Sequence, residues 1–172
     1  MRKRLTVYEG DITELPIDVI VNAANSTLLG GAGVDGAIHE AAGPKLREEC
    51  EQIGGCPTGE ARLTKGYALP ARWVIHTVGP IWQGGSFNEA SLLEDCYRNS
   101  LNIAEEHHFN KIAFPSISTG AYGYPVEMAA VIAVNVCKFF IDSSEIIEEI
   151  IFACFDRLTA SIYEELIDKI EK

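Results

Sequence analysis

Residues 19–36 read VIVNAANSTLLGGAGVDG, an apolar run that passes directly into a glycine-rich segment. The apolar run predicts a strand buried on both faces, and the residues from 36 onward predict a helix. A turn that leads from a strand into a helix presents free backbone N–H groups and the positive end of the helix dipole. Glycine also lets the backbone come close to a ligand. The segment therefore predicts an anion site.

The rest of the chain continues this alternation of apolar runs and helical patterns. Strands are predicted at residues 5–8, 19–23, 61–64, 73–78, 112–114 and 150–155. Helices are predicted at residues 36–42, 45–52, 89–107, 125–140 and 158–170. The alternation indicates an α/β fold, a three-layer α/β/α sandwich around a mixed, mostly parallel sheet. One pair of strands is expected to be antiparallel, because only a turn separates the two strands between residues 59 and 78.

Composition narrows the class of protein. The 172 residues fit one domain, 1–172, and the 47% hydrophobic content can fill its core. The sequence has neither a transmembrane stretch nor a signal peptide, so we expect a cytoplasmic protein without a membrane partner. The net charge of −11 disfavours nucleic acid as a partner, because it repels phosphate backbones. The five cysteines form no CxxC pair and no metal-ligand spacing with the four histidines, so neither disulfides nor a metal are expected.

A second glycine-rich segment, residues 114–125, reads FPSISTGAYGYP and again joins a predicted strand to a predicted helix. Consecutive N–H groups from Ser118 to Tyr122 can form an anion-binding nest. Two such loops predict a pocket that holds one diphosphate, although each loop alone can be read as a tight turn. The GxGxxG match at residues 31–36 does not indicate an NAD-dependent oxidoreductase, because residues 24–30 separate it from its strand.

Five motifs, in order along the chain, carry a resemblance to a known family. They read GDIT at residues 10–13, VNAAN at 21–25, GGAGVDG at 30–36, HTVGP at 76–80 and STGAYGYP at 118–125. The set resembles a macrodomain of the MacroD type, a group that includes the bacterial O-acetyl-ADP-ribose deacetylases. The resemblance extends from residue 6 to about residue 166. Ala32 departs from it, since a fourth successive glycine is common there, and alanine at positive φ is expected to alter loop closure slightly.

The resemblance implies an ADP-ribose pocket at the carboxyl ends of the strands. It implies that Asp11 binds the adenine amino group, that the N–H of Ile12 contacts the ring, and that Phe155, at the end of the last strand, packs on adenine. The residues expected to enclose the diphosphate and the distal ribose are Gly30, Gly31, Ala32, Gly33, Val34, Ser118, Thr119, Gly120, Ala121 and Tyr122. Two plainer roles stay open, Asp11 as a turn cap and Phe155 as a core aromatic.

Asn25 and Asp35 are the predicted catalytic residues. The Asn25 amide has both donors and acceptors, so it can orient a pair of ribose hydroxyls. The Asp35 carboxylate can accept a proton from water or a ribose hydroxyl, or it can simply cap the following helix. A helix N-terminus lowers the proton affinity of a carboxylate, which favours an orienting role and leaves a substrate phosphate open as the base. His76, in an apolar strand, is interpreted as a core histidine rather than as the partner of Ser116 in a catalytic triad.

The resemblance and these residues together imply a hydrolase of ADP-ribose esters. It would deacetylate O-acetyl-ADP-ribose and remove mono-ADP-ribose from acidic side chains of proteins, as a monomer without metal or cofactor. The expected partners are ADP-ribose, its esters and mono-ADP-ribosylated proteins. The alternative is a non-catalytic reader of ADP-ribose, which would have no need for both Asn25 and Asp35. Binding of single-stranded RNA is a third hypothesis, which the net charge and the lack of a basic stripe disfavour.

Overall fold

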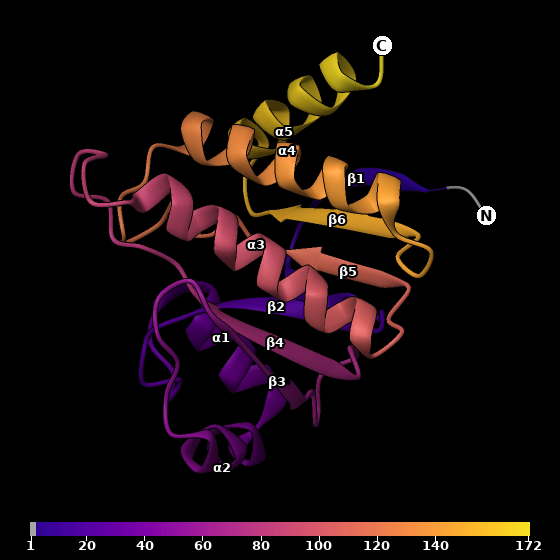
Figure 1. Ribbon diagram of the computed structural model, residues 1–172. Coiled ribbons are helices and arrows are strands. Elements are labelled where there is room, and N and C mark those ends of the chain that lie inside the picture. Colours follow the sequence, from indigo (N-terminus) through magenta and orange to yellow (C-terminus); the bar gives the residue numbers. More distant parts are fainter. Residues whose placement is uncertain (1–2) are drawn as a thin grey trace.

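A six-stranded sheet organises the computed structural model, which describes residues 3–172 (Figure 1). Its strands are β1 Arg4–Glu9, β2 Val19–Ala24, β3 Ala61–Lys65, β4 Trp73–Val78, β5 Lys111–Phe114 and β6 Glu149–Cys154. They lie in the order β1-β6-β5-β2-β4-β3. Every neighbouring pair is parallel except β3 and β4, which are antiparallel. The mixed, mostly parallel sheet and its antiparallel pair are therefore confirmed.

Helices cover both faces of this sheet. They are α1 Gly33–Ala42, α2 Pro44–Ile53, α3 Glu89–Glu106, α4 Val126–Ser143 and α5 Arg157–Ile170, with a short 3-10 helix, η1 Ile12–Glu14. One buried cluster joins the sheet to α3, α4 and α5, and a second joins the opposite face to α1, α2 and η1. In Figure 1, α3 and α4 accordingly lie in front of the sheet and α1 behind it. The structure confirms the α/β/α sandwich.

The apolar runs are continuous in strands such as β2 because both faces of the strand are buried. In β2, Val19 and Val21 pack under α3–α5, whereas Ile20 between them packs under α1 and α2. Successive strand residues point to opposite faces, so a strand between two helical layers has no solvated side. Full burial of each such side chain contributes about 1.5–3 kcal/mol.

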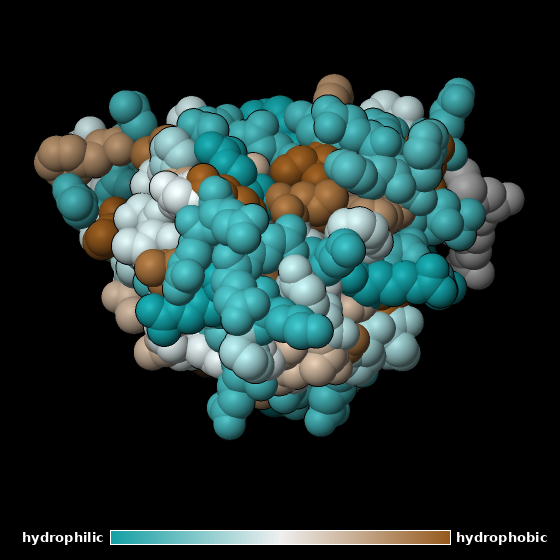
Figure 2. All heavy atoms as spheres, turned by 90° about the horizontal axis from the view of Figure 1, so that it is seen from below, coloured by the Kyte–Doolittle hydropathy of each residue, from teal (hydrophilic) through white to brown (hydrophobic). Residues whose placement is uncertain are grey.

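The α2 helix shows the other pattern, with one buried and one solvated side. Leu46 and Cys50, four residues apart, are fully buried against the sheet. Between them, Arg47 and Glu48 are exposed and Glu49 is half-buried. The face of the molecule that Figure 2 shows from below is largely hydrophilic. No helix within residues 3–172 is long and apolar enough to cross a membrane.

Element boundaries differ from the predicted ones at three places that matter for the site. Helix α1 begins at Gly33 rather than residue 36, because Ala32 already takes the extended conformation that precedes a helix. Pro125 is the N-cap of α4 rather than its first residue, and the helix continues to Ser143. Strand β6 ends at Cys154, opposite the last residue of β1, so Phe155 lies outside the strand.

Candidate functional site

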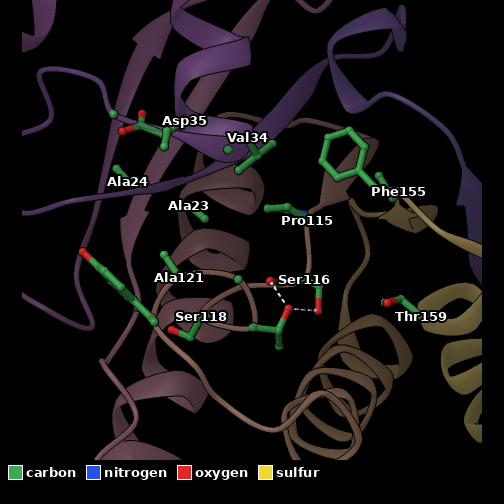
Figure 3. Close-up of a pocket in the computed structure, with 18 of the residues that line it drawn as sticks. Ala23, Ala24, Val34, Asp35, Pro115, Ser116, Ser118, Ala121, Phe155 and Thr159 are labelled. Carbon is green, nitrogen blue, oxygen red and sulfur yellow. Dashed lines mark hydrogen bonds between the residues drawn. The ribbon is translucent and has the colours of Figure 1, made fainter.

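A pocket of about 490 Å³ opens at the carboxyl ends of β2, β5 and β6. Figure 3 shows Asp35 and Val34, from the first glycine loop and the start of α1, across the pocket from Ser118 and Ala121 of the second loop, with Phe155 on a third side. Crevices at this edge of parallel sheets are the usual ligand sites of α/β proteins. The predicted residues that line this pocket are Asn25, Gly31, Ala32, Gly33, Val34, Asp35, Ser118, Thr119, Gly120, Ala121, Tyr122 and Phe155.

Asn25 holds the first glycine loop in shape. Its Oδ1 accepts hydrogen bonds from the N–H and the hydroxyl of Thr27, at 3.2 and 2.7 Å, and from the N–H of Leu28 at 3.2 Å. Its Nδ2 donates to the carbonyl of Gly30 at 3.0 Å. Because an amide nitrogen carries two hydrogens, one N–H remains for a ligand. Asn25 therefore supports the loop with its oxygen and can contact substrate only with its nitrogen.

The backbone of the first loop removes the strain expected at Ala32. Ala32 has φ −96° and ψ 178°, an extended conformation that any residue adopts. The left-handed φ values fall on Gly30 at 98° and Gly33 at 61°. The positive φ expected at Ala32 was therefore wrong. Gly36 instead allows α1 to pack closely against the first loop, since a Cβ there would lie 2.4 Å from the carbonyl oxygen of Gly31.

Asp35 lies in the first turn of α1, and its side chain is buried. It is 4% exposed, and its Oδ1 accepts a 2.8 Å hydrogen bond from Nδ2 of Asn22. His39, one turn further along α1, places Nε2 3.5 Å from the same oxygen. Ala32 is the N-cap of the helix and makes no side-chain cap, so the interpretation of Asp35 as only a cap was wrong.

Burial sets the proton affinity of Asp35. It raises the pKa of the carboxyl above its ordinary value of 3.8, although the Asn22 hydrogen bond and the nearby His39 act in the opposite direction. The position at a helix N-terminus was expected to lower the proton affinity, but the pKa is raised, and loss of solvent is the largest cause. A raised pKa makes Asp35 a better proton acceptor than an exposed aspartate.

Asn25 and Asp35 face the same space. A Cβ placed on Gly31 would lie 3.1 Å from Oδ2 of Asp35 and 3.4 Å from Nδ2 of Asn25. The glycine therefore leaves open the place where the free oxygen of one side chain and the nitrogen of the other converge. A ribose hydroxyl pair or a water molecule in this space would find one donor and one acceptor.

A chain of buried hydrogen bonds stands behind Asp35. Asn22 also donates to Nδ1 of His76 at 3.1 Å, so the neutral ring carries its proton on Nε2 and donates to the Thr64 hydroxyl at 2.9 Å. Burial, reinforced by the charge of His39, lowers the pKa of His76 to about 3. His76 is thus a hydrogen-bonded core histidine, which holds Asn22 in place. Asn22 and His39 were missed as site residues, although His39 follows Asp35 at helical spacing.

The second glycine loop presents backbone donors. The N–H groups of Gly120, Ala121 and Tyr122 have no hydrogen-bond partner among residues 3–172, whereas that of Thr119 bonds to the carbonyl of Ser116 at 3.4 Å. The Thr119 hydroxyl also bonds to the Ser116 hydroxyl at 2.8 Å (Figure 3). The loop therefore offers a shorter run of free donors than the predicted one. Successive free N–H groups of this kind bind anions.

Contacts with neighbouring segments fix the second loop. Ser118 has a left-handed φ of 67°, and its carbonyl accepts a hydrogen bond from Tyr124 at 2.9 Å. Gly79, just after β4, packs so closely that a Cβ there would lie 2.1 Å from the Ser118 hydroxyl oxygen. Gly120, in contrast, has no atom within 4 Å of a Cβ, and faces the pocket. Its missing side chain leaves room for a ligand rather than for the protein.

The predicted adenine residues lie at or beyond one end of the pocket. Phe155 lines it and is 61% exposed, so the alternative of a core aromatic was wrong. Asp11 and Ile12 lie outside the lining residues, as does Gly30 of the first loop. Asp11 caps η1, with Oδ1 accepting from the N–H and the hydroxyl of Thr13 at 2.9 and 2.7 Å. The N–H of Gly10 bonds to the carbonyl of Cys154 at 2.9 Å, so this turn adjoins the strand end that carries Phe155.

Comparison with known proteins agrees with the fold and the pocket. The chain belongs to the macrodomain family, since the family described as Macro domain matches residues 21–133. The resemblance seen in the sequence is thereby confirmed.

Individual relatives cover nearly the whole chain. A macro domain-containing protein of Chlorobaculum tepidum is 59% identical over 92% of this chain and 92% of its own. A protein of Citrobacter koseri named O-acetyl-ADP-ribose deacetylase is 53% identical over 97% of both chains. A mutant macrodomain of Oceanobacillus iheyensis, solved with ADPR (ADP-ribose), has a TM-score of 0.94 and 44% identity, covering 99% of this chain and 95% of that one.

Proposed function

We propose that this protein binds ADP-ribose in the pocket between its two glycine loops and hydrolyses esters of that ligand. The observation that carries the catalytic part is the buried Asp35 carboxylate, whose free oxygen meets the Asn25 amide at the gap left by Gly31. Support for the ligand comes from the free N–H groups of the second loop, from the N-terminus of α1 at the end of the first loop, and from the relative solved with ADPR. Support for hydrolysis comes from the relative named O-acetyl-ADP-ribose deacetylase.

The two loops divide the work of binding. The free N–H groups of Gly120, Ala121 and Tyr122 bind one side of the diphosphate, and the first turn of α1 binds the other. Phe155 packs on the adenine, and Asp11 and Ile12, just beyond it, contact the edge of the ring. The distal ribose then lies beside Asn25 and Asp35. Binding energy from the adenine and the diphosphate thereby positions the ester at the catalytic pair.

Hydrolysis follows from this placement. Asp35 accepts a proton from a water molecule, and the oxygen of that water attacks the acyl carbonyl or the anomeric carbon. The bond to the leaving oxygen breaks, a proton returns to the product, and the products are the free acid and ADP-ribose. Asn22 keeps the carboxylate oriented, and Asn25 orients the ribose hydroxyls. Backbone N–H groups stabilise the charge that develops in the transition state.

The substrate class includes mono-ADP-ribose on acidic side chains of proteins. A glutamyl or aspartyl ester of the distal ribose has the same reacting carbonyl as the acetyl ester, so the same water and the same base serve both. We propose that residues 1–172 act as one ADP-ribose-binding unit and as a monomer in the cytoplasm, with no metal in the reaction.

The deciding experiment incubates the protein with O-acetyl-ADP-ribose and, separately, with a glutamate-linked ADP-ribosylated protein in ¹⁸O-labelled water. Mass analysis should show ADP-ribose released from both, with the label in the acid if water attacks the acyl carbon and in the ribose if it attacks the anomeric carbon. Activity should persist with a chelator present. Tight binding of ADP-ribose without turnover of either substrate would instead establish a non-catalytic reader.

A further inference from the structure

Three side chains with metal-ligating atoms meet on the α1–α2 side of the sheet. His39 comes from α1, Cys50 from α2 and His76 from β4, and their ligand atoms all lie within 4.8 Å of one another. Sγ of Cys50 is 3.9 Å from Nε2 of His76. The spacing along the sequence predicted no metal-ligand set, because the three residues belong to three separate elements. The fold brings them together just behind Asp35.

Two polar atoms in and beside this cluster lack a hydrogen bond within the described chain, although one of them, Nε2 of His39, lies 3.5 Å from the Asp35 carboxylate. Nε2 of His39 and Oδ1 of Asn22 are buried and make no hydrogen bond within residues 3–172. The His39 side chain is only 13% exposed, and Asn22 is fully buried. Buried polar atoms make hydrogen bonds in the great majority of cases, so two neighbouring atoms without one indicate a place where a ligand can bind. A cation bound by Nε2 of His39 would supply the missing partner.

We propose that His39, Cys50 and His76 form a binding site for a soft divalent cation such as Zn²⁺, and that the bound ion inhibits the hydrolase. Two imidazoles and one thiolate are a typical ligand set for this ion. Zinc bonds of roughly 2.0–2.3 Å require the three ligand atoms to draw slightly closer together than they lie here. The Asp35 carboxylate lies 3.5 Å from Nε2 of His39, beside the site rather than among its three ligands.

Inhibition follows from the atoms that the ion would take. Coordination by Nε2 of His76 moves the ring proton to Nδ1, where it meets the Nδ2 donor of Asn22. The Asn22 amide must then turn over to present its oxygen, and this withdraws the hydrogen bond that Nδ2 gives to Asp35. The Cys50 thiol proton leaves to solvent as the thiolate binds. Nε2 of His39, which now faces Asp35, is taken up by the bound ion. Asp35 thereby loses the hydrogen bond that orients it, and the positive charge of the nearby ion makes its carboxylate a weaker proton acceptor.

The His39 side of the cluster faces a pocket on the surface. A second, more open pocket is lined by Leu29, His39, Glu40, Gly43, Pro44 and Arg47. His39 therefore lies between this pocket and the buried Cys50 and His76. The ion can enter there without passing through the ADP-ribose pocket, so inhibition should not compete with the ligand for access.

The test uses Cys50→Ala, with Cys56→Ala as the matched control, because Cys56 is also buried and lies outside the cluster. Zn²⁺ is titrated into the full chain against a chromophoric chelator, and Co²⁺ is added in parallel to detect thiolate-to-metal charge-transfer absorption. We expect one tight site in the wild type and in Cys56→Ala, and a loss of at least about tenfold in affinity in Cys50→Ala. Cys50→Ser serves if the alanine variant does not fold.

Equal affinity in Cys50→Ala and the wild type, or no stoichiometric site in the wild type, would overturn the metal site. The inhibitory part rests on the proposed function, so ester turnover is measured with and without one equivalent of Zn²⁺. Turnover should be lost in the wild type and retained in Cys50→Ala; equal turnover of the wild type with and without the ion would overturn the inhibition. A chain that binds Zn²⁺ through Cys50 but never turns over ester would contradict the proposed function and leave the metal site standing.

Discussion

The two glycine loops differ in what holds them. The first is fixed by side chains, since Asn25 bonds to Thr27, Leu28 and Gly30, and it leads directly to a buried network behind Asp35. The second is fixed mainly by backbone hydrogen bonds and close packing, with one side-chain contact between Thr119 and Ser116. It carries N–H groups at residues 120–122 that have no partner within residues 3–172. Both border one pocket.

This difference indicates a division between chemistry and binding. Polar side chains in a buried network have defined protonation and orientation, which a catalytic group needs. Unpaired backbone N–H groups carry no titratable atom and suit a fixed anionic ligand. Mutations in the first loop should therefore affect turnover or stability, whereas mutations in the second should affect affinity.

The largest expected effect comes from Asp35→Ala. Turnover of O-acetyl-ADP-ribose should fall by roughly 10²–10⁴-fold, because the proton acceptor is lost. Affinity for ADP-ribose should change far less, since the diphosphate donors are intact. Steady-state kinetics and calorimetry measure the two quantities. Equal losses in turnover and affinity would remove the proposed division of roles.

Gly120→Glu tests the second loop. The new carboxylate would enter the pocket and repel the diphosphate, so affinity for ADP-ribose should fall by about 100-fold or more. The melting temperature should stay near that of the wild type, because no atom lies within 4 Å of a Cβ at this position. Gly120→Ala is the control and should bind normally. If the glutamate variant bound as tightly as the wild type, the loop would not contact the ligand.

Gly36→Ala is the same chemical change as Gly120→Ala in a crowded place. Its Cβ would lie 2.4 Å from the Gly31 carbonyl oxygen, so the first loop must move away from α1. We expect a loss of about 1–3 kcal/mol in the free energy of unfolding, measured by urea denaturation. Equal stability of the two alanine variants would show that the contact between α1 and the loop is easily relaxed.

Asp35→Asn tests the buried network of the first loop through the pH dependence of stability. The folded-state pKa of Asp35 is raised above 3.8, so its contribution to stability is full below that pH and is lost as pH rises through the raised value. The asparagine variant, which cannot ionise, should therefore melt above the wild type near neutral pH and together with it in strong acid. Thermal melts across this range measure the difference. A variant less stable than the wild type near neutral pH would mean that the ionised carboxylate is favourably solvated.

Much of the fold could be predicted because apolar runs and helical stripes both follow from which faces of an element are buried. Strands such as β2 and β6 are buried on both faces, and the α2 stripe is buried on one. The boundaries at Ala32 and Phe155 were less predictable, because they depend on backbone angles and on where a neighbouring strand ends.

The site could be predicted only in part, for a similar reason. The glycine motifs mark where the backbone approaches a ligand, and they identify both loops. The network of Asn22, His39 and His76 arises from three elements that meet only in the folded chain. The proton affinity of Asp35 likewise depends on burial, which residue order does not reveal.

A crystal structure of the chain with ADP-ribose tests the central claim most directly. We predict diphosphate oxygens about 3 Å from N–H groups of both loops, with the distal ribose beside Asn25 and Asp35 and the adenine beside Phe155. A diphosphate bound by one loop alone, or a ligand with its adenine at Asp35, would contradict the account.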